Sequence, residues 1–246
     1  MFSFTFVDIC GIFQKVTKNL EYNSNNGKYN FNDDTDFKNY CDNGNCREET
    51  DKISAACLYF FDAFFKNSDN FVSVAKSNTN IVEYIMIWLS YTLNRTNSVE
   101  NKRLNEFYNK YINGGEKYKK DIEGVTGYTN YKDLIDRNYY LLTMDKNIIY
   151  KLYDALTSLC SMYFNDAGHI PTCEECMKDA NNFVTKYEEV INDPNITKNR
   201  LYSKVLSILS TLSTDYDNLK NNIADSSSLP SIKTKIYLQK YGFLSL

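Results

Sequence analysis

The sequence has few of the residues that break regular structure or carry acid–base catalysis. It contains 9 glycines and 3 prolines in 246 residues, which excludes collagen-like and linker-like chains and disfavours an all-β protein with many tight turns. Its single histidine is His169, so a catalytic site with a histidine base must use that residue. Phosphate-binding loops, dinucleotide-binding loops, nucleophile elbows and paired-histidine zinc motifs are missing from the sequence.

Long apolar runs and an excess of one charge sign are also missing. Polar Glu83, Ser90 and Asn94 flank the apolar run 85–89, whereas a membrane helix needs about 20 mostly apolar residues. The first 20 residues lack a basic start and contain Asp8, unlike a signal peptide. The net charge of −3 gives no basic face for nucleic acid. Taken alone, the chain is predicted to be soluble, with no nucleic-acid partner.

Asparagine, tyrosine and phenylalanine are abundant. The chain has 31 Asn, 21 Tyr and 15 Phe, and asparagine favours caps and turns because its side chain competes for backbone hydrogen bonds. One interpretation is an adaptable binding surface; a coding bias toward AT-rich codons explains the same excess. We expect exposed, Asn-rich loops over residues 23–45, 66–79, 113–130 and 165–171.

Apolar residues recur at helical spacing along most of the chain. The apolar stripes lie over residues 6–20, 53–64, 81–93, 104–112, 148–163, 173–190 and 201–219. This period of about 3.6 residues predicts amphipathic helices whose aromatic faces form a core. The fold class is therefore all-α. We expect one helical domain over residues 1–224 and a linker with a C-terminal tail over residues 225–246.

Seven cysteines form two groups along the chain. They are Cys10, Cys41, Cys46, Cys57, Cys160, Cys173 and Cys176, and all are candidates for disulfides, with one thiol left over from the odd total. Cys41 and Cys46 close a small loop. Cys160 ends one predicted helix, and Cys173 and Cys176 open the next, so a helix hairpin allows a bridge from Cys160 to either of them.

Metal binding is the alternative for the C-terminal group. Cys160, His169, Cys173 and Cys176 are the residue types of a tetrahedral zinc site, although a second well-spaced Cys pair is missing. This alternative predicts a zinc or thiol enzyme, and elemental analysis of the purified protein separates it from a disulfide-braced domain. Disulfides in an oxidising compartment are the simpler interpretation, and they predict no metal and no other cofactor. Buried free thiols are the third alternative.

Specific strings of residues resemble a known family. The segment 81–91 resembles the E-Y-x-x-M-W-L-S-Y core of the Plasmodium interspersed repeat (PIR) family of malaria variant antigens. Further matches follow in the family's order at residues 40–46, 52–59, 105–108, 131–136, 159–163, 173–176, 183–187 and 207–216. Together they span residues 8–222 and are most similar to the rodent-malaria branch (CIR/YIR/BIR type).

The resemblance implies a non-enzymatic variant surface antigen. It implies an α-helical ectodomain braced by disulfides, followed by one transmembrane helix and a short basic tail. It further implies export to the infected red cell or the parasite surface membrane, a role in antigenic variation and immune evasion, and contact with host-cell receptors and antibodies. The family gives no residue-level ligand contacts and no oligomeric state for this chain.

The sequence departs from the family pattern near its end. The family's membrane helix and basic tail are missing after Leu229 and Pro230, so the membrane anchoring that the family implies has no span here. This departure allows a truncated, atypical or non-functional copy, or a soluble helical scaffold without host contact. Ile223 stands where the family usually has a cysteine, which by resemblance leaves Cys173 or Cys176 without its partner.

Overall fold

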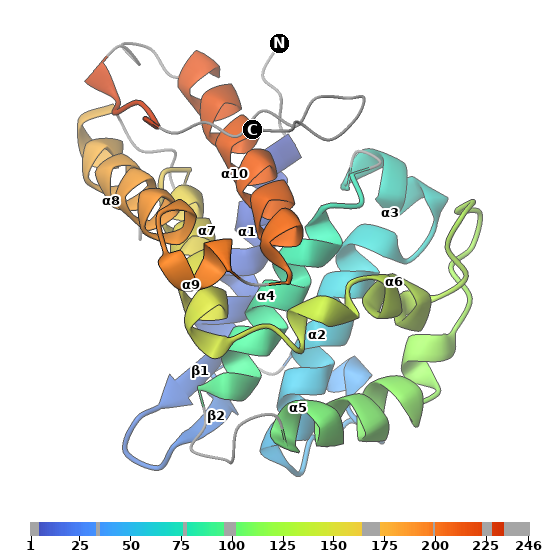
Figure 1. Cartoon of the computed structure of the whole chain (residues 1–246). Helices are drawn as coiled ribbons and strands as arrows, with labels where there is room; N and C mark the ends of the chain where they lie inside the picture. The colour runs from blue at the N-terminus through green and yellow to red at the C-terminus, as the bar shows by residue number, and fades with distance from the viewer. Residues whose placement is uncertain are drawn as a thin grey trace. The chain divides into compact units, whose positions relative to one another are not determined.

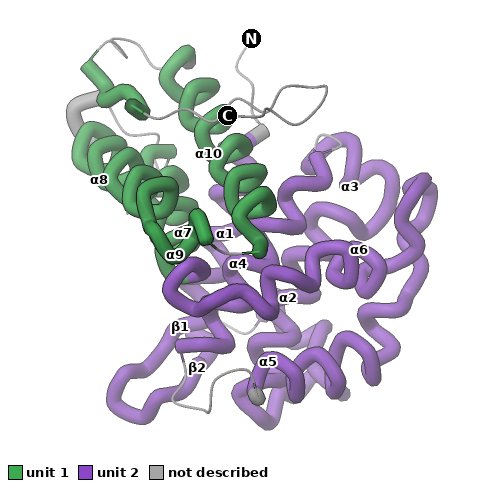
Figure 2. Tube along the Cα trace, viewed as in Figure 1, with its two compact units in different colours: residues 1–3, 150–246 green, residues 4–149 purple. Residues whose placement is uncertain are grey.

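The protein is described from a computed structural model, which is mainly helical (Figure 1). The structure describes residues 5–32, 35–75, 78–95, 102–163, 173–198, 200–222 and 228–233. The chain divides into two compact units, residues 4–149 and residues 1–3 with 150–246 (Figure 2). The helical architecture confirms the all-α prediction. The boundary predicted between residues 224 and 225 and most of the predicted tail lie outside the described residues.

The unit of residues 4–149 contains helices and one small antiparallel hairpin. Its elements are α1 (Thr5–Asn19), β1 (Leu20–Asn23), β2 (Lys28–Phe31), η1 (Lys38–Tyr40), α2 (Glu49–Phe65), α3 (Ser68–Ser73), α4 (Ile81–Asn94), α5 (Lys102–Phe107), η2 (Tyr108–Asn113), η3 (Lys117–Lys119), α6 (Tyr131–Arg137) and η4 (Tyr139–Leu141). α7 (Lys146–Ser161) begins at the end of this unit.

α2 and α4 carry the core of this unit and pack against each other (Figure 1). α4 is buried along most of its length, which explains why it has the most apolar sequence of the helices. Phe60 of α2 lies between Phe13 of α1 and Trp88 of α4, with ring centroids 4.5 Å and 5.0 Å away. The predicted aromatic stripes are therefore core faces, and burying each large side chain stabilises the fold by roughly 1.5–3 kcal/mol.

The structure differs from the prediction in the segment 23–45, where we expected an exposed loop. The chain there forms β2 and η1, and β1 pairs with β2 in the register Leu20–Phe31 to Asn23–Lys28. Tyr29 and Phe37 are buried, and the Phe31 and Phe37 rings stack at 5.0 Å. The sequence did not predict these contacts because the segment is locally polar, and two of the aromatic partners, Tyr22 and Tyr59, lie outside it. The prediction is also wrong at Tyr118, which is 1% exposed within the segment 113–130.

The other unit contains the rest of α7, followed by α8 (Cys173–Ile191), α9 (Pro194–Thr197) and α10 (Tyr202–Asn222). Phe183 of α8 packs on Tyr216 of α10 with ring centroids 4.9 Å apart. Asp193 begins α9 by accepting from the backbone N–H of Asn195, and its carboxylate lies 2.6 Å from Lys151 Nζ of α7. These contacts link α7 to α9 and α8 to α10.

Among the described residues, no helix combines the length and apolar character that crossing a bilayer requires.

Candidate functional site

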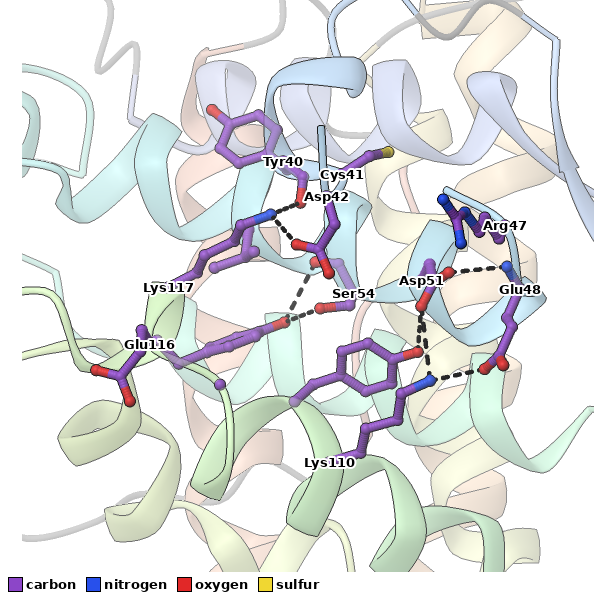
Figure 3. Close-up of a pocket in the computed structure, with 14 residues that line it drawn as sticks. Tyr40, Cys41, Asp42, Arg47, Glu48, Asp51, Ser54, Lys110, Glu116 and Lys117 are labelled. Atoms are coloured by element: carbon purple, nitrogen blue, oxygen red, sulfur yellow. Dashed lines mark hydrogen bonds and ion pairs between the residues drawn. The ribbon is translucent and has the colours of Figure 1, made fainter. Parts of the chain in front are cut away.

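A cavity of about 470 Å³ lies within the unit of residues 4–149. Its walls come from the loop that follows η1, the first turns of α2, and the segment from η2 to η3 (Figure 3). Its lining residues are Tyr40, Cys41, Asp42, Arg47, Glu48, Asp51, Ser54, Leu58, Lys110, Tyr111, Gly115, Glu116, Lys117 and Tyr118. Charged groups of both signs therefore surround tyrosine side chains in one recess that is open to solvent.

A disulfide shapes the first wall. Cys41 and Cys46 are bonded to each other, with their Cα atoms 4.9 Å apart, so residues 42–45 form a closed polar turn. Lys117 Nζ donates to the Tyr40 carbonyl oxygen at 2.6 Å and lies 2.9 Å from Asp42 Oδ1 (Figure 3). Lys117 thus links this loop to η3.

The start of α2 forms the second wall through a capping box. The Glu48 side chain accepts from the backbone N–H at the third helical position, and the Glu48 backbone N–H donates to Asp51 Oδ2 at 2.8 Å. This reciprocal pairing satisfies two backbone donors that a helix start leaves open. It also holds the two carboxylates of Glu48 and Asp51 at fixed positions in the cavity wall.

The third wall is a six-residue π-helix, η2. Its Lys110 Nζ lies 2.6 Å from Glu48 Oε2 and 3.7 Å from Asp51 Oδ1. The Tyr111 hydroxyl donates to Asp51 Oδ1 at 2.5 Å and lies 2.8 Å from Thr50 Oγ1. Two consecutive residues of the π-helix, Lys110 and Tyr111, therefore bind the side chains at the start of α2.

These contacts shift the ionisation of the wall residues. Burial alone raises the pKa of Asp51, but hydrogen bonds from the Glu48 backbone and the Tyr111 hydroxyl outweigh it and hold that pKa below its ordinary value. The hydrogen bond to Glu48 and then that to Tyr111 raise the pKa of Lys110. Both groups therefore keep their charges at neutral pH.

Two buried residues with hydroxyl groups, Ser54 and Tyr118, also line the cavity, and a buried thiol lies behind them. The Tyr118 hydroxyl lies 3.2 Å from both the side-chain and the backbone oxygen of Ser54. Cys57 lies next to it, fully buried, and burial raises the pKa of its thiol to about 12. A thiol with so high a pKa is a poor nucleophile at neutral pH.

The cysteines predicted to form disulfides have different outcomes. Cys41 and Cys46 are bonded, and Cys10 and Cys160 are each disulfide-bonded. Cys57 and Cys176 are buried thiols, so the structure contradicts both as disulfide candidates, and it contradicts the alternative that joined Cys160 to Cys176. Cys57 lies on the core face of α2 among apolar side chains, where no second sulfur is within bonding distance.

The zinc alternative is not supported where the structure describes its residues. Because the Cys160 sulfur is in a disulfide, it is not available as the thiolate that zinc requires. His169 lies outside the described residues, and so does the side chain of Cys173. Across the described ranges, no group of three or more His, Cys, Asp or Glu side chains is placed to hold a metal ion.

The match that identifies the chain covers residues 10–244, and the matching family is described as Plasmodium variant antigen protein Cir/Yir/Bir. The chain belongs to this family. A solved structure described as a Plasmodium PIR protein ectodomain is also similar, with a TM-score of 0.68 and 29% sequence identity over 94% of this chain and 98% of that chain. No curated protein matches the chain.

Membership of the Cir/Yir/Bir family confirms the resemblance that the sequence strings carried, and the similarity to a PIR ectodomain confirms the helical fold. The cavity was not predicted from the sequence. Its residues come from three separate segments, residues 40–58, 110–111 and 115–118. The one local signal was the pair Gly114-Gly115 after an apolar stripe, which predicts a helix end but no site.

Proposed function

We propose that this Cir/Yir/Bir protein is a host-facing, non-enzymatic variant surface antigen, exported to the infected red cell. In this role it contributes to antigenic variation and immune evasion and contacts host-cell receptors and antibodies. The observation that carries the proposal is the family match over residues 10–244, which covers nearly the whole chain. The similarity to a PIR ectodomain along 94% of the chain supports it.

The distribution of polar residues in the described part of the chain supports a variable exterior. The hairpin turn between Asn23 and Lys28 and the closed turn of residues 42–45 are largely exposed and polar, whereas the stripes of α2 and α4 are buried. Surface loops accept substitutions and insertions at little thermodynamic cost. Antibody-driven change can therefore accumulate in these turns without loss of the helical core.

A non-enzymatic role agrees with the chemistry of the sulfur groups. The Cys57 thiol is buried with a raised pKa, and Cys160 is held in a disulfide. The polar groups of the cavity form ion pairs and hydrogen bonds with one another, which suits binding better than proton transfer to a reacting group.

Surface staining of infected red cells tests the location. Antibodies raised against the folded domain should label intact, non-permeabilised cells, and trypsin treatment of those cells should remove the label. An antibody against a parasite cytosolic protein serves as the control for intact membranes. Label that appears only after permeabilisation, and only in the parasite cytosol, contradicts the proposal.

Binding to host proteins tests the contact. The folded domain, presented as a multimer, should bind a subset of receptors displayed from red cells and leukocytes. The same domain after reduction and heating is the matched control, because it keeps the composition and loses the folded surface. Equal binding by both forms, or binding by neither, counts against receptor contact.

A further inference from the structure

A second cavity of about 600 Å³ adjoins the first within the unit of residues 4–149. Glu48, Lys110 and Tyr111 line both, so the Lys110–Glu48 ion pair and the Tyr111 side chain form a wall between them. Each volume lies in the range of about 300–1,000 Å³ that holds small ligands in proteins. The two cavities are therefore large enough for two linked parts of one ligand, the terminal part in the first cavity and the next part in the second.

The wall between the cavities is carried on the π-helix η2 (Tyr108–Asn113). π-Helical turns are rare, and they occur frequently at functional sites. Here the π-helix aims consecutive residues, Lys110 and Tyr111, at the first turn of α2. This unusual backbone is an observation independent of the cavities, and it coincides with their shared wall.

Among the charged side chains that line the first cavity, Arg47 is not paired with any of the carboxylates. Glu48 pairs with Lys110, Asp51 accepts from Tyr111 and Asp42 pairs with Lys117. Arg47 is an exposed residue that lines the cavity, and Figure 3 draws no dashed line from its guanidinium to the other residues shown. A planar guanidinium matches the two oxygens of a carboxylate.

The other lining residues limit which kind of ligand can carry a carboxylate to Arg47. The lining has three cationic side chains and four carboxylates, so its net charge repels a polyanion such as an acidic peptide, and a single carboxylate is stabilised only where it meets the Arg47 guanidinium directly. Hydroxyl groups of a ligand both donate and accept hydrogen bonds. The wall offers them the Lys110 ammonium as a donor and the Glu48 and Glu116 carboxylates as acceptors. The Tyr111 ring is already in contact with Lys110 Nζ, 4.7 Å from its centroid, and with the Phe107 ring at 4.9 Å, so it forms part of the wall.

We infer that the cavity lined by Arg47 binds a carboxylated sugar, with the carboxylate on the Arg47 guanidinium and the hydroxyl groups on the polar side chains of the wall. The adjoining cavity receives the next residue of the glycan. The inference rests on the proposed host-facing function, because a host glycan presents such a sugar at its free end. A free acidic sugar shares the same chemistry, and the test below distinguishes the two sources.

Titration of the full chain with sialyllactose, lactose and free sialic acid tests the site. Sialyllactose should bind and lactose should not; free sialic acid should bind more weakly, because it leaves the second cavity empty. Arg47→Ala should lower the affinity for sialyllactose by about tenfold or more, since it removes a charge-assisted pair. Arg47→Lys should recover only part of the loss, because an ammonium lacks the planar fork.

A substitution with the opposite sign sharpens the test. Glu48→Gln keeps a capping oxygen but removes the charge that pairs with Lys110, so it should raise the affinity severalfold by releasing the ammonium to the ligand. Lys28→Ala is the matched control, because Lys28 is an exposed lysine of β2 outside both cavities. Circular dichroism of each variant establishes that it is folded.

The outcomes separate this inference from the proposed function. Equal affinity of Arg47→Ala and Lys28→Ala for sialyllactose, or equal binding of lactose and sialyllactose, overturns the sugar site. Binding of an acidic peptide in place of the sugar also overturns it. Receptor binding that survives Arg47→Ala and sialidase treatment of the host cells leaves the proposed function standing without this site. A parasite-cytosolic location defeats the proposed function, while the titration still reports on the cavity.

Discussion

At the residue scale, buried polar groups in this protein have partners that lie far away in the sequence. Ser90 is fully buried in α4, and its hydroxyl donates to the Leu141 carbonyl oxygen of η4 at 2.8 Å. A buried donor or acceptor left without a partner costs about 1–3 kcal/mol. The serine in an otherwise apolar helix is therefore explained by the carbonyl group it satisfies.

Substitution of this serine tests that explanation. Ser90→Ala should lower the free energy of unfolding by about 1–3 kcal/mol, because it leaves the Leu141 carbonyl oxygen buried without its donor. Urea unfolding followed by circular dichroism measures the loss. Ser73→Ala is the control, because the Ser73 hydroxyl is exposed and bonds only within its own helix. Similar stabilities for the two variants would mean that the hydrogen bond contributes little.

At the element scale, two short devices place the candidate site. The capping box fixes the start of α2, and the π-helix η2 ends at Asn113 with Gly114 and Gly115 behind it. The Gly115 backbone N–H donates to the Tyr111 carbonyl oxygen at 3.1 Å, and a Cβ at Gly115 would lie 2.2 Å from that oxygen. Glycine is required there because the backbone approaches itself closely.

A methyl group at Gly115 should therefore disturb both the turn and the cavity. Gly115→Ala is expected to lower the free energy of unfolding by about 1–3 kcal/mol, in the range of other overpacked sites. Chemical unfolding measures it. Gly127→Ala is the comparison variant, because Gly127 has a left-handed φ of 92° and open space around its Cβ position. Its loss of stability therefore reports backbone conformation alone, whereas the loss in Gly115→Ala reports steric overlap. A loss in Gly115→Ala no larger than about 0.5 kcal/mol would contradict the steric argument.

The disulfide loop between η1 and α2 gives a second prediction at this scale. Cys41→Ser with Cys46→Ser should lower the free energy of unfolding by about 2 kcal/mol, because the closed loop is short and its bond restricts the unfolded chain modestly. Thermal unfolding of the double variant measures this effect. Cys57→Ser tests a different mechanism, since it changes a buried thiol and no cross-link. A loss of zero for the double variant would show that Lys117 alone holds the loop.

At the scale of the whole molecule, acid should unfold the protein. The Asp51 and Asp133 side chains have lowered pKa values, where hydrogen bonds outweigh burial, and the hydrogen bond from Lys151 lowers the pKa of Asp193. Because each folded pKa lies below the ordinary value of 3.8, the unfolded chain binds more protons in acid. The stability these groups contribute is present above that value and is lost as pH falls through the folded pKa.

Unfolding measured between pH 7 and pH 2 should therefore show a plateau near neutrality and a decline below about pH 4. Asp51→Asn should make the decline shallower. Asp154→Asn should do the reverse, because burial raises the pKa of Asp154 and its protonation in acid favours the folded state. A decline of equal steepness in both variants would place the acid sensitivity elsewhere.

The sequence by itself determined the helical class and the faces of the helices. Apolar residues at a period of 3.6 mark the buried sides of α2 and α10 because a helix turns 100° per residue whatever it packs against. The segment that contains Glu83 and Tyr91 identified the family by its similarity to the family's core motif. These properties depend on residues close together along the chain, and so they are readable from it.

The tertiary structure alone decided the hairpin, the fate of the cysteines and the candidate site. Residues 28–31 and Phe37 look polar or isolated locally, and they become a strand and a core residue because α2 supplies their apolar partners. Which sulfurs bond depends on distances between segments that spacing does not give. The cavity beside Arg47 needs α2, η2 and η3 together, since charges and rings more than 50 residues apart in sequence form its walls.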